Sequence, residues 1–411
     1  MDRRSHFTLA LCVLLHAFTH AYGVILVPLY LLMTADLHLG GVKAVALIVT
    51  AYGVVYNACS FAAGTMADRF DRRVLLGIGL IGNAAAIMCM GLTRDYPLLL
   101  LLGVLAGLFG TLFHPSANAL VCAHYPKNPG MAIGLLGMGS GLGFFAGPQF
   151  AGWRAQHSNW QRPCIELGVA GLVLGTLFIF IAKEAGEHRR GSGPKLGSRL
   201  SRLVVMLSAI LGWRDFAGVA TMSLASIYLQ RACGRTVQEA GLILGLMMLL
   251  GMIANPLGVF LTHGRRRLPA LSAVCVAGGI SLASTPFFPA AWVLVPLCAA
   301  QTLQLGSYAI SDAATLERVS PAVRGRVVGV FLTFAGTLAA LSPWCMGFWT
   351  DRLGPVASRQ SGYVWPFATL GLMMLVAAFA PLVIRKFGEP SGVRPITVAE
   401  EIMPETMEGL V

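Results

Sequence analysis

The sequence predicts an all-α membrane protein whose two pseudo-symmetric halves are bundles of six transmembrane helices each. Three observations support this fold class. Apolar residues make up 56% of the 411 residues and charged residues only 12%, about half the charged share of a soluble domain. The apolar segments have the length, roughly 20 residues, that crosses a bilayer as a helix. The second half of the chain also repeats features of the first.

The repeat is visible at individual positions. Gly64 and the pair Arg72-Arg73 recur 194 residues later as Gly258 and Arg266-Arg267. With an offset of 195, a second set recurs: Pro126, Gly130, Gly134, Pro148 and Gly152 match Pro321, Gly325, Gly329, Pro343 and Gly347. Duplicated halves built from apolar segments are typical of transporters whose substrate site lies between two bundles.

Twelve spans are expected along the chain. They lie at residues 8–33, 44–66, 74–92, 97–121, 130–152, 164–183, 203–230, 238–262, 268–287, 290–316, 325–350 and 362–384. The first span follows Arg3-Arg4 and is too long for a signal-peptide core, so we expect it to be retained. Residues 1–183 and 203–386 then form the two bundles. Residues 184–202 form a basic cytoplasmic linker, and the acidic tail 387–411 is expected to be disordered.

The basic residues predict the orientation. With a cytoplasmic N-terminus, 21 of the 30 Lys and Arg residues fall in cytoplasmic segments and eight in outside loops. The positive-inside rule therefore places both termini in the cytoplasm, for a multi-pass protein of the inner membrane. Basic loops beside anionic lipid explain the net charge of +12 without a nucleic-acid partner. The nine cysteines form no Cys-x-x-Cys pair, so neither a disulfide framework, a metal site nor another cofactor is predicted.

The stretch between the second and third spans carries a recognisable motif. Gly64-x-x-x-Asp68-Arg69-x-x-Arg72-Arg73 resembles the G-x-x-x-D-R-x-G-R-R signature of the major facilitator superfamily, with Asp71 in place of the second glycine. The resemblance covers about residues 5–386. It implies the twelve-helix major facilitator fold, a small-molecule substrate, contact with membrane lipids and function as a monomer.

The resemblance also implies a cytoplasmic latch that closes while the cavity faces outward. Asp68 would accept hydrogen bonds from the start of the eleventh span, around Arg324–Val327, and the arginines would pair with carboxylates or lipid phosphate. Thr262 replaces the aspartate in the second copy, so that latch should be weaker. Alternatively, the arginines only set the topology. The expected gate comprises Gly64, Asp68, Arg69, Arg72, Arg73, Arg266, Arg267 and Asp312.

The fifth span carries a glycine motif that resembles one found in the antiporters of this superfamily. It consists of Gly134, Gly143, Gly147, Pro148 and Gly152. Gly143 and Gly147 predict close helix packing, and Pro148 predicts a bend. Phe113-His114-Pro115, a histidine in the first span and Arg214 are similar to the fosmidomycin-resistance branch of drug exporters. This chain has Thr19-His20 where that branch has an Asn-Asp pair.

Ionisable residues inside spans are costly, so each is a candidate for substrate or proton binding. His16 and His20 are four residues apart and share one helix face, and histidine exchanges protons near neutral pH. They could instead be core histidines that bond to neighbouring helices. Neighbours on a helix point about 100° apart, so we expect Arg214 to face the cavity and bind an anionic group. Asp215 would then pair with another helix or carry the proton.

The alternative for that pair is a structural ion pair. His114, Asn118, Gln301 and Gln304 complete the candidate set, although the two glutamines could simply hold helices together. Together these residues predict a secondary transporter that works by alternating access, with proton-coupled export of a drug-like or amphipathic compound as the main hypothesis. Uptake or facilitated movement of a metabolite, and a membrane sensor or scaffold, are alternatives. No H-E-x-x-H or G-x-S-x-G motif indicates an enzyme.

Overall fold

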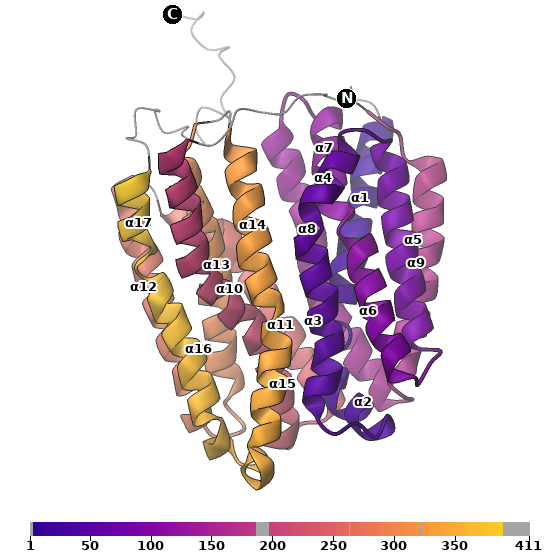
Figure 1. The fold of residues 1–411 in the computed structure, drawn as a ribbon, viewed down its shortest axis with the longest axis vertical. Helices are drawn as coiled ribbons and strands as arrows, with labels where there is room; N and C mark the ends of the chain where they lie inside the picture. Colours follow the sequence, from indigo (N-terminus) through magenta and orange to yellow (C-terminus); the bar gives the residue numbers. More distant parts are fainter. Residues whose placement is uncertain (1–2, 186–196, 263, 321–322, 389–411) are drawn as a thin grey trace, which may run out of the picture.

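The chain folds into two bundles of long helices that stand side by side, as Figure 1 shows for the computed structural model. The structure describes residues 3–185, 197–262, 264–320 and 323–388. Most of the predicted linker and nearly all of the predicted tail therefore lie outside the described residues. All regular elements in the described ranges are helices, as expected for the fold class.

The N-terminal half runs from indigo to magenta in Figure 1. Its elements are α1 (Arg3–Val24), η1 (Val27–Leu29), α2 (Tyr30–Asp36), α3 (Val42–Ala58), α4 (Ser60–Ala67), α5 (Arg72–Met90), α6 (Tyr96–Gly110), α7 (Phe113–His124), α8 (Pro129–Gln156) and α9 (Gln161–Ile181).

The C-terminal half runs on to orange and yellow. Its elements are α10 (Ser198–Arg231), α11 (Val237–Leu261), η2 (Gly264–Arg266), α12 (Arg267–Ser284), η3 (Thr285–Phe287), α13 (Leu294–Leu316), α14 (Arg324–Ala340), α15 (Ser342–Arg352), η5 (Gly354–Ser358), η6 (Gln360–Tyr363), α16 (Val364–Ala377) and α17 (Ala380–Phe387). Because α10 begins at Ser198, residues 198–202 are helical and do not belong to the linker as predicted.

The helices account for the predicted number of spans. Within the described ranges, ten helical segments are long and apolar enough to cross a membrane, and the bent pair α3 and α4 makes an eleventh. The twelfth is α13, whose 23 residues are more polar because they include Gln301, Gln304, Ser307 and Ser311. Twelve spans are therefore consistent with the structure, and the most polar of them is in the C-terminal half.

Several predicted spans are broken into two helices. The fourth span breaks between α6 and α7, at Thr111 and Leu112. Pro115 explains this break, because its ring has no N–H to donate and clashes with the carbonyl four residues earlier. The eleventh span breaks in the same way at Leu341, two residues before Pro343. In the fifth span, by contrast, Pro148 lies inside the unbroken helix α8.

Both ends of the described chain lie at one end of the bundle, where α1 begins and α17 ends (Figure 1). Arg199, near the start of α10, joins the two ends of the C-terminal half there by donating to the carbonyl oxygen of Gly388 at 2.9 Å. The motif arginines Arg69, Arg72, Arg73, Arg265, Arg266 and Arg267 also follow helices that finish at this end, which we call the basic end. The other end is called the opposite end.

Candidate functional site

Three histidines from two helices meet in the N-terminal half. His16 and His20 lie one turn apart on α1, and His114 is in the first turn of α7. The Nε2 atoms of His16 and His20 are 3.0 Å apart, and the ring of His114 lies 5.1 Å and 5.4 Å from theirs. We call His16, His20 and His114 the histidine cluster. The break before α7 brings the third ring to the first two.

Hydrogen bonding and packing orient these rings. Nδ1 of His16 is 2.7 Å from the carbonyl oxygen of Leu136 on α8 and donates to it, which leaves Nε2 free to accept. Phe113 stacks on His16 with ring centroids 4.7 Å apart, and Phe144 packs on His20 at 4.4 Å. His16 is buried, whereas His20 and His114 remain partly accessible. The sequence prediction that His16 and His20 share a face is confirmed.

The C-terminal half holds a buried ion pair. Arg214 on α10 is fully buried, and its Nε donates to Oδ1 of Asp215 at 2.9 Å. Its NH1 donates to Oγ of Ser311 at 2.9 Å and to the carbonyl oxygen of Ser307 at 3.2 Å, both on α13. The guanidinium also stacks over the ring of Tyr308, 3.9 Å from its centre. We call Arg214, Asp215, Ser307, Tyr308 and Ser311 the arginine cluster.

The arginine cluster corrects one prediction. We expected Arg214 to face the cavity and bind an anionic group, with Asp215 paired elsewhere. The 100° between neighbouring helix positions does not separate them, because the long arginine side chain turns back to the adjacent carboxylate. A buried guanidinium is stable only with such partners. In this conformation Arg214 and Asp215 form an ion pair, which is the structural alternative given by the sequence. Ser307 and Ser311 of α13 accept further hydrogen bonds from Arg214.

The two clusters occupy repeated positions. His20 and Arg214 are 194 residues apart, and so are His114 and Tyr308. In each half the first-helix residue contacts the fourth-helix residue, at 5.4 Å between the histidine rings and 3.9 Å between guanidinium and tyrosine ring. Tyr308 and Ser307 were missed by the sequence reasoning, although the 194-residue repeat points to Tyr308.

The remaining candidates fall into two groups. Gln301 and Gln304 are buried, and Gln304 donates to the carbonyl oxygen of Arg214 at 3.2 Å, so they hold helices together and do not line a cavity. Asn118 and Asp312, again 194 residues apart, are exposed on α7 and α13. Asp312 directly follows Ser311 on α13, and the Ser311 hydroxyl accepts from Arg214 at 2.9 Å. Asp312 therefore lies beside the arginine cluster, and its place in the cytoplasmic gate stays a prediction.

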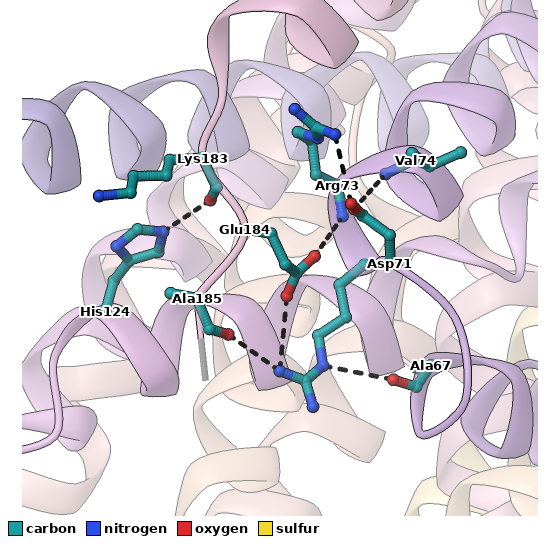
Figure 2. A network of polar contacts seen from close by, with 9 residues as sticks. Ala67, Asp71, Arg73, Val74, His124, Lys183, Glu184 and Ala185 are labelled. Atoms are coloured by element: carbon teal, nitrogen blue, oxygen red, sulfur yellow. Dashed lines mark hydrogen bonds and ion pairs between the residues drawn. The ribbon is translucent and has the colours of Figure 1, made fainter. Parts of the chain in front are cut away.

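At the basic end, the motif arginines form a network around Glu184 (Figure 2). Arg72 donates to the carbonyl oxygens of Ala67 at 3.3 Å and Ala185 at 3.1 Å, and its NH1 is 3.6 Å from the Glu184 carboxylate. The backbone N–H of Arg73 donates to Glu184 at 3.0 Å. Arg72 and Arg73 thus tie the start of α5 to the chain that leaves α9, within one half.

Two carboxylates in this network are shifted in opposite directions. Burial raises the pKa of Glu184 above its ordinary value, and the neighbouring Asp71 adds to the shift despite the hydrogen bond from Arg73. Burial also acts to raise the pKa of Asp71, but the hydrogen bond from the Val74 N–H and the charge of Arg73 outweigh it, so that pKa is lowered. Asp71, which replaces the usual glycine, is the N-cap of α5.

The second copy of the motif keeps one contact and changes the other. Nε of Arg267 donates to the carbonyl oxygen of Thr262 at 3.0 Å, as Arg72 does to Ala67 five residues before it. Its ion-pair partner, however, is Glu317 just after α13. Arg266 is exposed. In this half, the carboxylate partner of the motif arginine is therefore Glu317, which follows α13.

The predicted latch between the halves is open. Asp68 and Arg69 are exposed, and in the described ranges their side chains make no hydrogen bond or ion pair. Asp68 was expected against the start of α14, around Arg324–Val327. In the described ranges Asp68 makes no such contact, so its part in a latch stays a prediction. Gly64 lies on α4, and a Cβ atom added to it would lie 4.0 Å from the Cβ of Pro115.

At the opposite end, hydrogen bonds join the two halves. The Asp351 carboxylate at the end of α15 accepts from the backbone N–H groups of Val42 at 2.8 Å and Lys43 at 3.0 Å, at the start of α3. Ser226 of α10 donates to the carbonyl oxygen of Val27 at 2.7 Å, and Gln230 donates to that of Pro28 at 3.0 Å. This sealed end, which sequence reasoning missed, is the counterpart of the open latch.

The glycine motif of α8 packs against both halves. A Cβ on Gly143 or Gly147 would meet the backbone of Ala17 or Ala21 on α1, and one on Gly152 would meet α11 of the other half. Gly134 has open space around it, with nothing within 4 Å of a Cβ. The prediction of close packing is confirmed for Gly143 and Gly147, and the structure adds Gly152, whereas Gly134 has open space around it.

Comparisons with known proteins agree with this architecture. The family model described as "Major Facilitator Superfamily" matches residues 9–343. A tetracenomycin C resistance and export protein of Streptomyces glaucescens is 31% identical over 152 residues, 36% of this chain and 28% of that protein. Multidrug resistance protein MdtG of Escherichia coli is 29% identical over 279 residues, which are 64% of each chain. The chain thus spans less than two thirds of the length of these relatives.

Solved structures extend the likeness in fold. A bacterial homolog of the human lysosomal transporter Spinster, in an inward-facing and occupied conformation, has a TM-score of 0.77 at 17% identity and covers 94% of this chain and 97% of its own. The nucleoside transporter NupG has a TM-score of 0.72 at 13% identity, over 92% of this chain and 100% of its own.

Proposed function

This chain belongs to the Major Facilitator Superfamily and is a membrane transporter rather than an enzyme, and from that premise we propose that it exports a drug-like or amphipathic compound in exchange for protons. The basic end would face the cytoplasm of the inner membrane, with both termini inside. A monomer with two rocking halves is sufficient for this mechanism. Uptake or facilitated movement of a metabolite is the second candidate.

One observation carries the alternating-access mechanism: the two ends of the interface between the halves are in different states. Asp351 and Gln230 bridge the halves at the opposite end, whereas Asp68 at the basic end is unpaired among the described residues. A carrier that opens to one side at a time must exchange such contacts. On this proposal, the structure corresponds to a state that is open toward the basic end.

Export is favoured by the relatives and by α8. The two curated relatives are named for resistance, one of them also for export. In α8, Gly143 and Gly152 bring the helix close to α1 and to α11, in different halves. Small residues of this kind let helices approach closely, and the motif resembles the fifth-span motif of the superfamily's antiporters, which supports export by exchange.

For proton coupling we assign Asp312 as the carrier. It is exposed, and an ionised carboxylate within a membrane-spanning helix is tolerated where water or a cation stabilises it. Arg214 supplies the cation, because it bonds to Ser311, the residue next to Asp312 on α13, at 2.9 Å. Protonation of Asp312 would weaken its attraction to Arg214 on α10 and so loosen α13, while deprotonation would strengthen it.

The test is proton movement in liposomes that contain the purified protein and an internal pH-sensitive dye. We expect a panel of amphipathic compounds to cause a compound-dependent pH change, and Asp312→Asn to abolish it while leaving exchange of labelled compound intact. Asp95→Asn is the matched control, because Asp95 caps α6 through the Leu98 N–H and asparagine also caps. Compound flux without any pH change in the wild type would instead support facilitated transport.

A further inference from the structure

The histidine cluster has an arrangement that a proton relay does not need. Three imidazoles from two helices point toward one another, and a ring nitrogen of each lies within 4.8 Å of the others. Two histidines would be enough to pass a proton along α1. A third one, from a different helix, closes a triangle of nitrogen atoms around a common point.

We propose that His16, His20 and His114 form a binding site for a divalent transition-metal ion of the zinc class. Neutral imidazole is a preferred ligand for Zn²⁺, Cu²⁺ and Ni²⁺. In a tetrahedral zinc site with Zn–N bonds of about 2.0–2.1 Å, the ligand nitrogens are roughly 3.3 Å apart. The 3.0 Å between His16 and His20 is close to that spacing, and His114 reaches it by a small side-chain movement.

The surroundings of His16 are those of a metal ligand. Its Nδ1 donates to the carbonyl oxygen of Leu136 at 2.7 Å, so the proton is held on Nδ1 and the Nε2 lone pair points to the cluster. Metal-binding histidines commonly donate their second nitrogen in this way. Phe113 and Phe144 cover the flanks of His16 and His20. For His20 to bind metal, its proton needs only to move to Nδ1.

Three histidines leave one tetrahedral position open. The hydroxyl oxygen of Tyr56 is buried without a hydrogen-bond partner among the described residues, and its ring lies 6.1 Å from that of His114. It is placed to bond a water or an oxygen ligand on the ion. Because neutral imidazoles leave the charge of the ion uncompensated, the fourth ligand would be an anionic or chelating oxygen. His20 and His114 are partly accessible, which gives the ion a route in.

The proposal is independent of the direction and coupling proposed above, and it is tested by binding alone. The full chain is purified without a polyhistidine tag, and Zn²⁺ binding is measured by calorimetry and by metal analysis. Co²⁺ is used as a second probe, because its visible absorption reports tetrahedral coordination. We expect one ion per protein and weaker binding, by more than roughly 10-fold, in His20→Ala and His114→Ala.

His157→Ala is the matched control, because His157 is exposed at the end of α8 and bonds only to the Trp153 carbonyl. It should bind zinc like the wild type. His114→Gln repeats the test with a side chain of similar reach, in case the alanine variant does not fold. Absence of bound metal in the wild type, or equal binding in the wild type and all histidine variants, would overturn the proposal.

Discussion

The two halves place their central polar side chains at the same positions of equivalent helices, but the side chains differ in charge. In the N-terminal half, the rings of His20 and His114 meet and are partly accessible. In the C-terminal half, Arg214 and Tyr308 take those positions, and the guanidinium is fully buried beside Asp215. The repeat therefore determines where polar groups lie, and the residue type decides whether they are structural or available to a ligand.

The largest expected effect separates these clusters. Arg214→Ala leaves Asp215 as a buried charge without its partner, which should lower the free energy of unfolding by about 3–5 kcal/mol. His20→Ala removes an uncharged ring and should cost much less. Thermal unfolding in detergent, followed by tryptophan fluorescence, measures both. The double change Arg214→Met with Asp215→Leu removes both charges and should recover most of the loss. An Arg214→Ala protein as stable as the wild type would contradict the structural role.

The second test uses the glycine face, which only the N-terminal half has in its fifth span. Gly143→Leu copies the C-terminal counterpart, Leu338, and should destabilise by about 1–3 kcal/mol because the side chain meets the backbone of Ala17. Gly134→Ala lies in open space and should stabilise the helix by about 0.5–1 kcal/mol. Unfolding temperatures of the two variants give the comparison. Equal effects would mean that the packing between α1 and α8 is not tight.

The third test compares the latch aspartates, one from each half. Asp351→Ala removes the acceptor for the N–H groups of Val42 and Lys43, which should cost about 0.5–2 kcal/mol, as for a lost helix cap. Hydrogen exchange at the start of α3 should become faster. Asp68→Asn should leave that exchange unchanged but slow transport, because Asp68 acts when the basic end closes. Identical exchange changes in both variants would show that the ends do not alternate.

The smallest expected effect concerns pH at the basic end. Because the folded protein raises the pKa of Glu184, the stability linked to its proton is present below its unfolded pKa, about 4.3, and is lost as pH rises through the folded pKa. Glu184→Gln should therefore gain stability relative to the wild type between about pH 4 and 7. Asp71 has a lowered pKa, so Asp71→Asn should lose stability relative to the wild type above about pH 4. Melting temperatures across this range would reveal both slopes, and parallel curves would contradict the assignment.

The sequence predicted some of the site and misplaced some of it. Spacing alone put His16 and His20 on one face, since helix periodicity is local. It could not bring His114 to them, because that depends on how the break before α7 directs the chain. Arg214 was misplaced because helix angles describe where a Cβ points, while a long side chain can turn back to Asp215. Asp351 was missed because its partners are backbone N–H groups of the other half.

Composition, the twelve apolar segments and the 194-residue repeat were sufficient to predict a helical membrane protein with duplicated halves. They suffice because the lipid interior requires every backbone amide to be bonded within its own helix. The tertiary structure alone decided which polar groups meet and that hydrogen bonds join the halves at the opposite end while Asp68 is unpaired among the described residues. It also decided that Glu184 and Glu317 bind corresponding arginines. Those contacts join residues far apart in the chain, from 50 positions between Arg267 and Glu317 to 309 between Val42 and Asp351, where no local pattern constrains the partner.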